Sequence, residues 1–153
     1  MVWACVIHNW KGNNLFESSP WDNNYNWEKE GRWTFEGILD GIEEEEGREV
    51  LVVEDGAPCH RSAVAKNVCN ELGITNLEHP PSLPDLNPIE PLWLLLKTRV
   101  ADIPGLGNSL DGLWAAVQQV WEELSIEDVR KHTSRMQDRV DEVIKAKGWH
   151  TSF

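Results

Sequence analysis

A buried strand in the middle of the chain constrains the fold most narrowly. Residues 49–54 read Glu-Val-Leu-Val-Val-Glu, a run whose interior is apolar and mostly β-branched. Such runs are typical of strands that are covered on both faces, as in sheets with helices on either side. Segments 35–46 and 62–72 flank this strand, and the first carries apolar residues at helical spacing. The alternation of strand and helix predicts an α/β fold.

The two ends of the chain predict a hairpin and a helical tail. Residues 2–8 form a short apolar run that reads as a strand, and a turn at 11–14 leads into a second strand. Near the C-terminus, residues 110–124 and 126–143 each carry one apolar stripe, which predicts two amphipathic helices. We therefore expect a single domain over residues 1–153, with C-terminal helices from about residue 109.

Capping residues mark several helix ends. Gly73 closes the helix that precedes it, and Ser125 with Asp128 three residues later suits the start of the last helix. Asn87 is followed by Pro and, at the third helical position, by Glu90. This order is typical of a helix that begins at the Asn.

The chain is strongly acidic, with a net charge of -12 from 26 acidic and 14 basic residues. Nucleic-acid-binding modules generally carry the opposite balance, because phosphate is neutralised by Lys and Arg. Part of the excess lies in the run Glu43–Glu46, which reads as a solvated helix end. The balance argues against tight DNA binding by this chain alone. It leaves room for a site in which carboxylates hold metal ions and the ions meet the phosphates.

The sequence carries no sign of a membrane span or a basic leader before its first strand. Its three cysteines, Cys5, Cys59 and Cys69, are odd in number and form no CxxC pair, which favours reduced thiols. We therefore expect an intracellular protein that does not bind membranes, and a nuclear one in a eukaryote.

Two segments carry candidate functional carboxylates. Asp55 stands where the buried strand ends and a Gly/Pro turn begins, and functional groups converge at such strand ends in open α/β sheets. Asp also starts turns for purely structural reasons. Glu90 follows a proline-rich stretch, and a Glu at this helical position is equally half of a capping box. Each segment alone leaves both interpretations open.

Together the two segments resemble the DDE catalytic core of mariner-superfamily transposases. Residues 55–60 match the pattern Asp-Asn/Gly-Ala-Pro-x-His, and residues 80–93 match the proline-rich pattern that ends in Asp-Leu-Asn-Pro-Ile-Glu-x-x-Trp. The 34 residues between Asp55 and Glu90 are the spacing typical of the family. The segment beyond Ser134 is also similar to the usual ending of these proteins.

The resemblance implies a ribonuclease H-like mixed sheet flanked by helices and a metal-dependent DNA endonuclease and strand transferase. Asp55 and Glu90 then correspond to the second and third carboxylates, which bind Mg²⁺ or Mn²⁺. DNA and a second copy of the chain are the candidate partners. In the family, the first catalytic Asp lies on a strand just before a segment similar to Val2–Cys5. We therefore expect the first strand, its Asp and the helix-turn-helix region to be missing here.

Two supporting residues have alternative roles. His60 has two candidate roles. It contacts phosphate or shuttles a proton near the metal, or it holds the turn through hydrogen bonds. We favour the role in the turn. Asn87 is a better candidate for a helix cap than for a ligand. Because the missing Asp bridges the two ions in the family, we expect weak metal binding and little or no cleavage. The functional hypotheses are therefore an incomplete transposase-derived nuclease, a non-catalytic interaction module that retains the fold, and a chain whose true start lies upstream.

Overall fold

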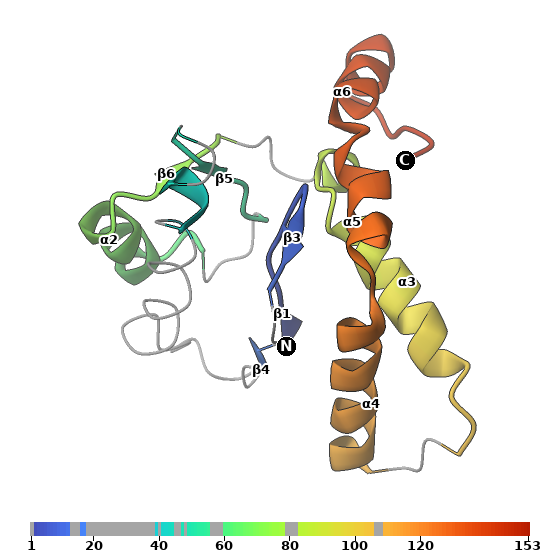
Figure 1. Cartoon of the computed structure of the whole chain (residues 1–153). Helices are drawn as coiled ribbons and strands as arrows, with labels where there is room; N and C mark the ends of the chain where they lie inside the picture. The colour runs from blue at the N-terminus through green and yellow to red at the C-terminus, as the bar shows by residue number, and fades with distance from the viewer. Residues whose placement is uncertain are drawn as a thin grey trace. The chain divides into compact units, whose positions relative to one another are not determined.

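The computed structural model of the protein describes residues 2–12, 16–17, 39, 41–44, 47, 49–55, 60–78, 83–105 and 109–153 (Figure 1). They divide into two units. Unit 1 comprises Met1–Glu17 and Pro84–Phe153, and unit 2 comprises Ser18–Leu83. Each unit is described by itself, so the single domain expected over residues 1–153 stays a prediction.

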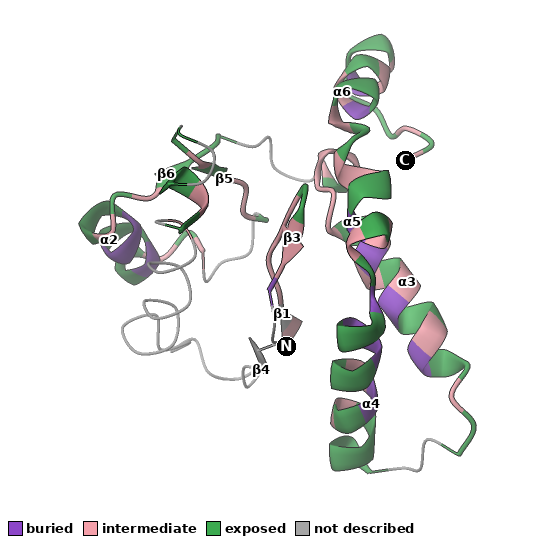
Figure 2. Ribbon diagram, in the orientation of Figure 1, coloured by how far each residue is buried: buried purple, intermediate pink, exposed green. Residues whose placement is uncertain are grey.

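Unit 1 is built around its helices, which are α3 (Glu90–Ala101), α4 (Leu110–Glu123), α5 (Ile126–Thr133) and α6 (Met136–Lys145). Figure 2 shows buried positions along these helices, but Leu110 and Leu113, at the start of the stripe expected over 110–124, are 84% and 44% exposed. The centre of this core consists of Leu96, Val100, Val120, Trp121 and Leu124. Within the described ranges, no helix combines the length and the apolar character needed to cross a membrane.

The predicted last helix is divided in two, which corrects the expectation of one helix over residues 126–143. Helix α5 begins at a capping box in which Ser125 and Asp128 bond each other's backbone N–H groups, as predicted. It ends at Thr133, and α6 begins at Met136. The hydroxyl groups of Thr133 and Ser134 donate to carbonyls one turn earlier, at 3.1 and 2.6 Å. Such local bonds can weaken a helix, but Thr98 makes the same bond inside the unbroken α3, so they do not explain the break by themselves.

Two antiparallel strand pairs lie at the N-terminal end of unit 1. Strand β1 (Val2–Trp3) pairs with β4 (Phe16–Glu17), and β2 (Val6–Ile7) pairs with β3 (Trp10–Lys11). The β2–β3 turn is therefore at residues 8–9, and Lys11 lies in a strand rather than in the turn expected at 11–14, of which residues 13 and 14 lie outside the described residues. The reason is the register, because Ile7 faces Trp10 and leaves only two residues between the strands. The second strand expected after 11–14 is present as β4 and pairs with β1.

The β2–β3 hairpin is fixed to the helices by Trp121. The indole Nε1–H of Trp121 donates to the Gly12 carbonyl over 2.8 Å, and both residues are buried. In return, the Lys11 ammonium group donates to the Trp121 carbonyl over 2.7 Å. The Trp93 ring stacks on Trp121 with 5.9 Å between the ring centroids and packs, partly buried, against the core.

Helix α5 holds the tip of the same hairpin. The His8 ring lies 3.0 Å from the Thr133 hydroxyl, and the Arg130 guanidinium donates to the Asn9 side chain over 3.0 Å. These contacts join segments more than a hundred residues apart, so the N-terminal strands and the C-terminal helices form one packed unit.

Unit 2 contains the central strand of the sequence prediction. Strand β5 (Leu51–Val52) pairs in parallel with β6 (Thr75–Asn76), and helix α2 (Ala63–Glu71) connects them. The Ser62 hydroxyl accepts the Ala65 N–H over 3.1 Å at the start of α2, and Gly73 adopts a φ of 65° after its end. A glycine is favoured there because other residues avoid positive φ. The predicted helix and strand order is thus confirmed.

Strand β5 is less covered than predicted. Leu51 is 49% exposed, whereas the apolar run at 49–54 predicts burial on both faces. Of the helix expected at 35–46, residues 39 and 41–44 are helical and Gly47 follows at a φ of 65°, while half of its apolar stripe lies outside the described residues.

Candidate active site

Asp55 lies just beyond the carboxyl end of β5, as the sequence predicts. Its side chain is 55% exposed, and one carboxylate oxygen lies 3.4 Å from Nε2 of His60. The other ring nitrogen of His60, Nδ1, lies 2.8 Å from the Glu54 carboxylate. The His60 side chain is only 9% exposed. A buried imidazole therefore connects an exposed carboxylate with a half-buried one.

Glu54 is held from a second side. The Asn76 amide, on the neighbouring strand β6, donates to the Glu54 carboxylate over 3.0 Å. Because a carboxylate only accepts hydrogen bonds, the proton of the 2.8 Å contact belongs to His60 Nδ1. His60 therefore bonds Glu54 and at the same time places its second nitrogen beside Asp55. The hydrogen bond to Glu54 is in line with the structural role favoured for His60, whereas a contact with phosphate or a proton transfer near a metal stays a prediction.

Glu90 is the first residue of α3 and is exposed. A carboxylate in the first turn of a helix is favoured by the helix dipole. Within the described part of the chain, the Glu90 carboxylate makes no hydrogen bond or ion pair. The alternative of a capping box is not realised, because the Asn87 N–H that such a box needs donates to the Pro84 carbonyl instead, over 2.8 Å.

The start of α3 corrects the expectation that the helix begins at Asn87. A 3₁₀ turn, η2 (Pro84–Leu86), precedes Asn87, and the α-helix begins three residues after it. The Asn87 side chain accepts the Ile89 N–H over 3.2 Å, so Asn87 stabilises a turn before the helix rather than the helix end. Its short side chain favours such local bonds, which delays the helix.

Asp85, in the same proline-rich segment, is bonded to the C-terminal tail. Its carboxylate accepts both the backbone N–H and the hydroxyl of Thr151, over 2.7 and 2.8 Å. The bond from the Thr151 N–H is the largest influence on this carboxyl, and it lowers the pKa of Asp85 below 3.8. The positive charge of Arg139 adds to this lowering of the pKa, while burial opposes it.

A pH dependence follows from this shift. A carboxyl group with a lowered pKa in the folded state stabilises the protein above its unfolded-state pKa, and the contribution disappears as pH falls through the folded-state pKa. We expect the free energy of unfolding to fall less between about pH 5 and pH 3 in Asp85→Asn than in the unmodified chain. Urea unfolding followed by circular dichroism measures this at each pH. Asp102→Asn, an exposed carboxylate on the same unit, is the control, and equal pH slopes in the Asp85→Asn and unmodified chains would contradict the assignment.

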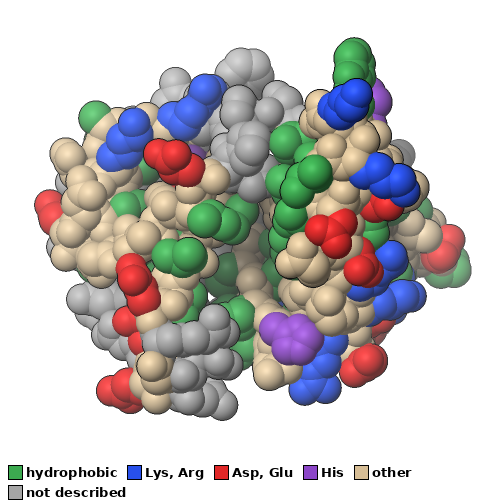
Figure 3. Space-filling model, turned by 90° about the horizontal axis from the view of Figure 1, so that it is seen from above, with side chains coloured by type: hydrophobic (Ala, Val, Ile, Leu, Met, Phe, Trp, Pro, Cys, Tyr) green, Lys and Arg blue, Asp and Glu red, His purple; other side chains and the backbone are tan. Residues whose placement is uncertain are grey.

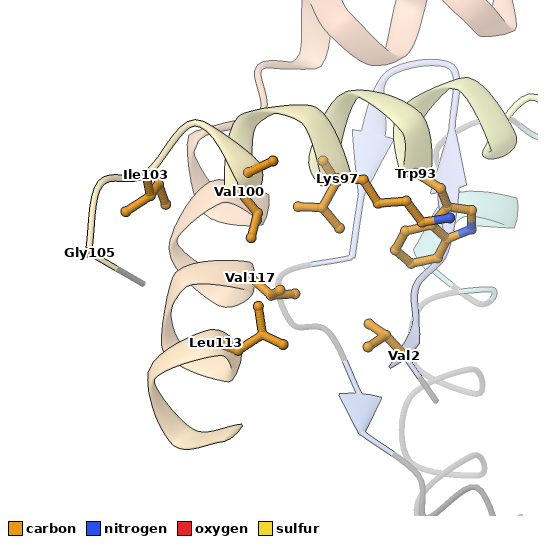
Figure 4. Close-up of a pocket in the computed structure, with 10 residues that line it drawn as sticks. Val2, Trp93, Lys97, Val100, Ile103, Gly105, Leu113 and Val117 are labelled. Atoms are coloured by element: carbon orange, nitrogen blue, oxygen red, sulfur yellow. The ribbon is translucent and has the colours of Figure 1, made fainter. Parts of the chain in front are cut away.

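An apolar pocket of about 580 Å³ lies in unit 1 between α3, α4 and β1 (Figure 4). Lys97 is its charged lining residue, and apolar side chains such as Trp93, Val117 and Val2 form most of its wall. Trp93 and Lys97 lie one and two helical turns after Glu90 on α3. The pocket therefore extends along the helix that carries Glu90, but its own lining lacks a carboxylate.

The candidate carboxylates lie in different units, Asp55 in unit 2 and Glu90 in unit 1. Their convergence at one end of the sheet therefore stays a prediction. Among the described residues, no group of three or more His, Cys, Asp or Glu side chains is placed to hold a metal ion.

The sequence model of the family described as "DDE superfamily endonuclease" matches residues 24–105, more than half of the chain. The chain belongs to this family. The region that matches the DDE endonucleases contains both Asp55 and Glu90. Among curated proteins, the transposase of the element Tcb1 from Caenorhabditis briggsae is 29% identical over 107 residues, and that of Tc1 from Caenorhabditis elegans is 28% identical over the same length. Each match covers 70% of this chain and 38% of the relative, so the chain spans well under half of their length.

Solved structures confirm the fold class. The catalytic domain of Mos1 mariner transposase superposes with a TM-score of 0.75 at 12% identity, over 99% of this chain and 82% of that one. A second structure of the Mos1 catalytic domain, with raltegravir and Mn, gives a TM-score of 0.66 over the same shares. The predicted ribonuclease H-like fold is thereby confirmed. The family match and the Tc1-type relatives confirm the resemblance to mariner-superfamily transposases.

Three residues with supporting contacts were missed by the sequence analysis. Glu54 bonds His60, Asn76 bonds Glu54, and Thr151 bonds Asp85. Glu54 stands next to Asp55, so its position at the strand end was a usable signal. No spacing rule connects Asp85 with Thr151, because they lie 66 residues apart in the sequence.

Proposed function

We propose that this chain is part of a transposase that cuts and joins DNA strands with divalent metal ions, and that Asp55 and Glu90 are two of its metal ligands. The observation that carries this proposal is the position of both carboxylates inside the matched DDE endonuclease region. Their exposure supports it as well, because an exposed carboxylate is accessible to a metal ion.

The donor chemistry fits Mg²⁺ or Mn²⁺. Both ions prefer hard oxygen ligands such as carboxylates, and Mg²⁺ keeps several waters while it takes only one or two protein carboxylates. When bound, such ions stabilise the attacking and leaving oxygens of an in-line displacement at phosphorus. The Mn in one structure of the Mos1 catalytic domain is in line with this choice.

The residues around Asp55 supply orientation. His60 limits the rotation of the Asp55 carboxylate through its 3.4 Å contact, and Glu54 fixes the His60 ring from the other side. Side chains that orient a metal ligand through hydrogen bonds, such as a carboxylate bonded to a histidine, are common around metal sites. On this proposal His60 contributes by positioning Asp55.

We further propose that Asp55 and Glu90 alone do not make a complete catalytic site. A pair of ions about 3.5–4 Å apart requires a carboxylate that bridges them. The resemblance assigns this role to an Asp on a strand upstream of Val2. A non-catalytic interaction module would instead need no metal at Asp55 or Glu90. The nicking assay described below distinguishes the nuclease from such a module.

DNA is the proposed partner, and the nucleus the proposed place of action in a eukaryote. The face of the molecule in Figure 3 carries Lys and Arg side chains interspersed with Asp and Glu, and the net charge is -12. Phosphate contacts need an excess of basic side chains. We therefore propose that DNA is bound mainly by regions outside the matched part, such as those of the longer curated relatives.

A nicking assay on supercoiled plasmid DNA tests the proposal. Residues 1–153 with Mg²⁺ or Mn²⁺ are expected to leave the plasmid intact, because Asp55 and Glu90 alone supply no carboxylate that bridges two ions. A chain extended at its N-terminus by a strand that bears an Asp is expected to nick it, with Asp55→Ala of each chain as the control. Nicking by the short chain that disappears in its Asp55→Ala variant would disprove incompleteness. The nuclease proposal fails if the extended chain binds metal at neither carboxylate.

A further inference from the structure

The C-terminal tail is bonded to the segment just before Glu90. Thr151 donates two hydrogen bonds, from its backbone N–H and its hydroxyl, to the same oxygen of the Asp85 carboxylate, at 2.7 and 2.8 Å. Bonds to a charged acceptor are stronger than neutral ones. The Thr151 hydroxyl also accepts the Phe153 N–H over 3.2 Å, so the tail folds back at this contact.

Helix α6 reinforces the same contact. Arg139 is 3% exposed, and its guanidinium donates to the backbone carbonyl of Asp85 over 2.8 Å. The Phe153 ring lies against two guanidinium groups, 4.6 Å from Arg135 and 4.8 Å from Arg139. Cation–π contacts of this kind attract more strongly when they are shielded from water. Asp85 is therefore held through both its side chain and its backbone.

Backbone hydrogen bonds connect Asp85 with Glu90. The Asn87 N–H donates to the Pro84 carbonyl over 2.8 Å, and the Glu90 N–H donates to the Asn87 carbonyl over 3.2 Å. The Asn87 side chain accepts the Ile89 N–H over 3.2 Å. These bonds form an unbroken series of turns from Asp85 to the first residue of α3. The Glu90 carboxylate has no partner among the described residues, and these turns fix the place of the Glu90 backbone from which its side chain extends.

The body of α3 is anchored differently. Leu92 and Leu96 are 0% and 4% exposed and fix the helix from its first turn onward through apolar packing. Packing of these residues constrains the axis of the helix. The conformation of the turns before Glu90 depends instead on the polar contacts of Asp85. A substitution in the tail should therefore alter those turns without altering the helix.

We propose that Asp85 and Thr151 form a latch through which the C-terminal tail positions Glu90, and that they are positioning residues for metal binding at this carboxylate. The proposal rests on the proposed function for the role of Glu90, and on the contacts within unit 1 for the latch itself. It assigns a role to the tail that the Asp-Leu-Asn-Pro-Ile-Glu pattern does not contain.

Backbone amide exchange, measured by NMR in the full 153-residue chain, tests the latch without any metal. Thr151→Val removes the hydroxyl at nearly constant volume, and we expect amide exchange at Asn87, Ile89 and Glu90 to become about five- to tenfold faster. Exchange in the middle of α3, at Leu96, should not change. Thr151→Ser should restore the slow rates, because it keeps the hydroxyl group.

Two further variants bracket this result. Ser152→Ala changes an exposed neighbour in the same tail and should leave every rate unchanged. Asp85→Ala removes the acceptor of both Thr151 bonds and should have the larger effect. Wild-type rates at Asn87, Ile89 and Glu90 in both Thr151→Val and Asp85→Ala would overturn the latch. Equal acceleration throughout α3 would also overturn it, because that result indicates general destabilisation.

Paramagnetic broadening by Mn²⁺ then connects the latch with the metal. Added Mn²⁺ is expected to broaden signals around Glu90, less so in Glu90→Gln, and to an intermediate extent in Thr151→Val. Equal broadening in Thr151→Val and the unmodified chain would overturn the positioning role. If the unmodified chain and Glu90→Gln broaden equally, the proposed function of Glu90 fails, and the exchange rates still decide whether the latch exists.

Discussion

Replacing Trp121 with alanine is expected to lower the free energy of unfolding by about 3–5 kcal/mol. The side chain is 1% exposed and lies at the centre of the apolar core of unit 1. Its Nε1–H also satisfies the buried Gly12 carbonyl, which links the β2–β3 hairpin to the helices. Since small domains are stable by only about 5–15 kcal/mol, the loss removes much of the total.

Chemical unfolding followed by far-ultraviolet circular dichroism measures this change. Trp149→Ala is a matched control, because Trp149 is 72% exposed and its loss should change stability by about 0.5 kcal/mol or less. Trp121→Phe separates packing from hydrogen bonding, since it keeps a ring but leaves the Gly12 carbonyl without its donor, at a cost of about 1–3 kcal/mol. A shift for Trp121→Ala no larger than that for Trp149→Ala would show that the hairpin and helices do not share one core.

Local chemistry explains which parts of the fold were predictable. Ser62 and Gly73 delimit α2, and Ser125 with Asp128 begins α5, because caps and positive-φ glycines act within a few residues. The position of Asp55 after the central strand was predictable for the same reason. Such signals need no knowledge of what the segment packs against.

The errors occurred where local preferences competed. Asn87 is a good helix cap, but its bond to the Ile89 N–H forms a separate turn, and the helix begins at Glu90. The apolar stripe continues past Ser134, although α5 ends at Thr133 and α6 begins at Met136. An apolar stripe reports which side faces the core and not whether the helix is continuous.

The contacts that hold Asp85 could not be predicted from the sequence, for a different reason. The contacts of Asp85 with Thr151 and Arg139 depend on tertiary packing that brings segments 54 to 66 residues apart together. Nothing in the spacing of these residues indicates such contacts. The candidate ligands were recognisable from a pattern, whereas the residues that hold them were recognisable only from the structure.

In a chain extended at its N-terminus by an Asp-bearing strand, Asp55→Asn and Glu90→Gln are each expected to reduce Mg²⁺-dependent DNA cleavage on the order of 10²–10³-fold. Each substitution keeps the size of the side chain and removes its charge. A neutral amide oxygen binds Mg²⁺ more weakly than a carboxylate, so the charge stabilisation at the reacting phosphate is lost. Both positions are exposed, so the free energy of unfolding without metal should stay within about 0.5 kcal/mol of the unmodified chain.

Rates of plasmid nicking and thermal unfolding curves, measured on the same preparations, check both halves of this expectation. Asp102→Asn is the matched control, because Asp102 is an exposed carboxylate at the opposite end of α3 and should keep full activity. The double variant should be no worse than the more damaging single one, since two ligands of one metal centre act as a unit. Full cleavage by either single variant would remove that residue from the metal site. Additive losses would instead indicate that Asp55 and Glu90 act at separate places on the DNA.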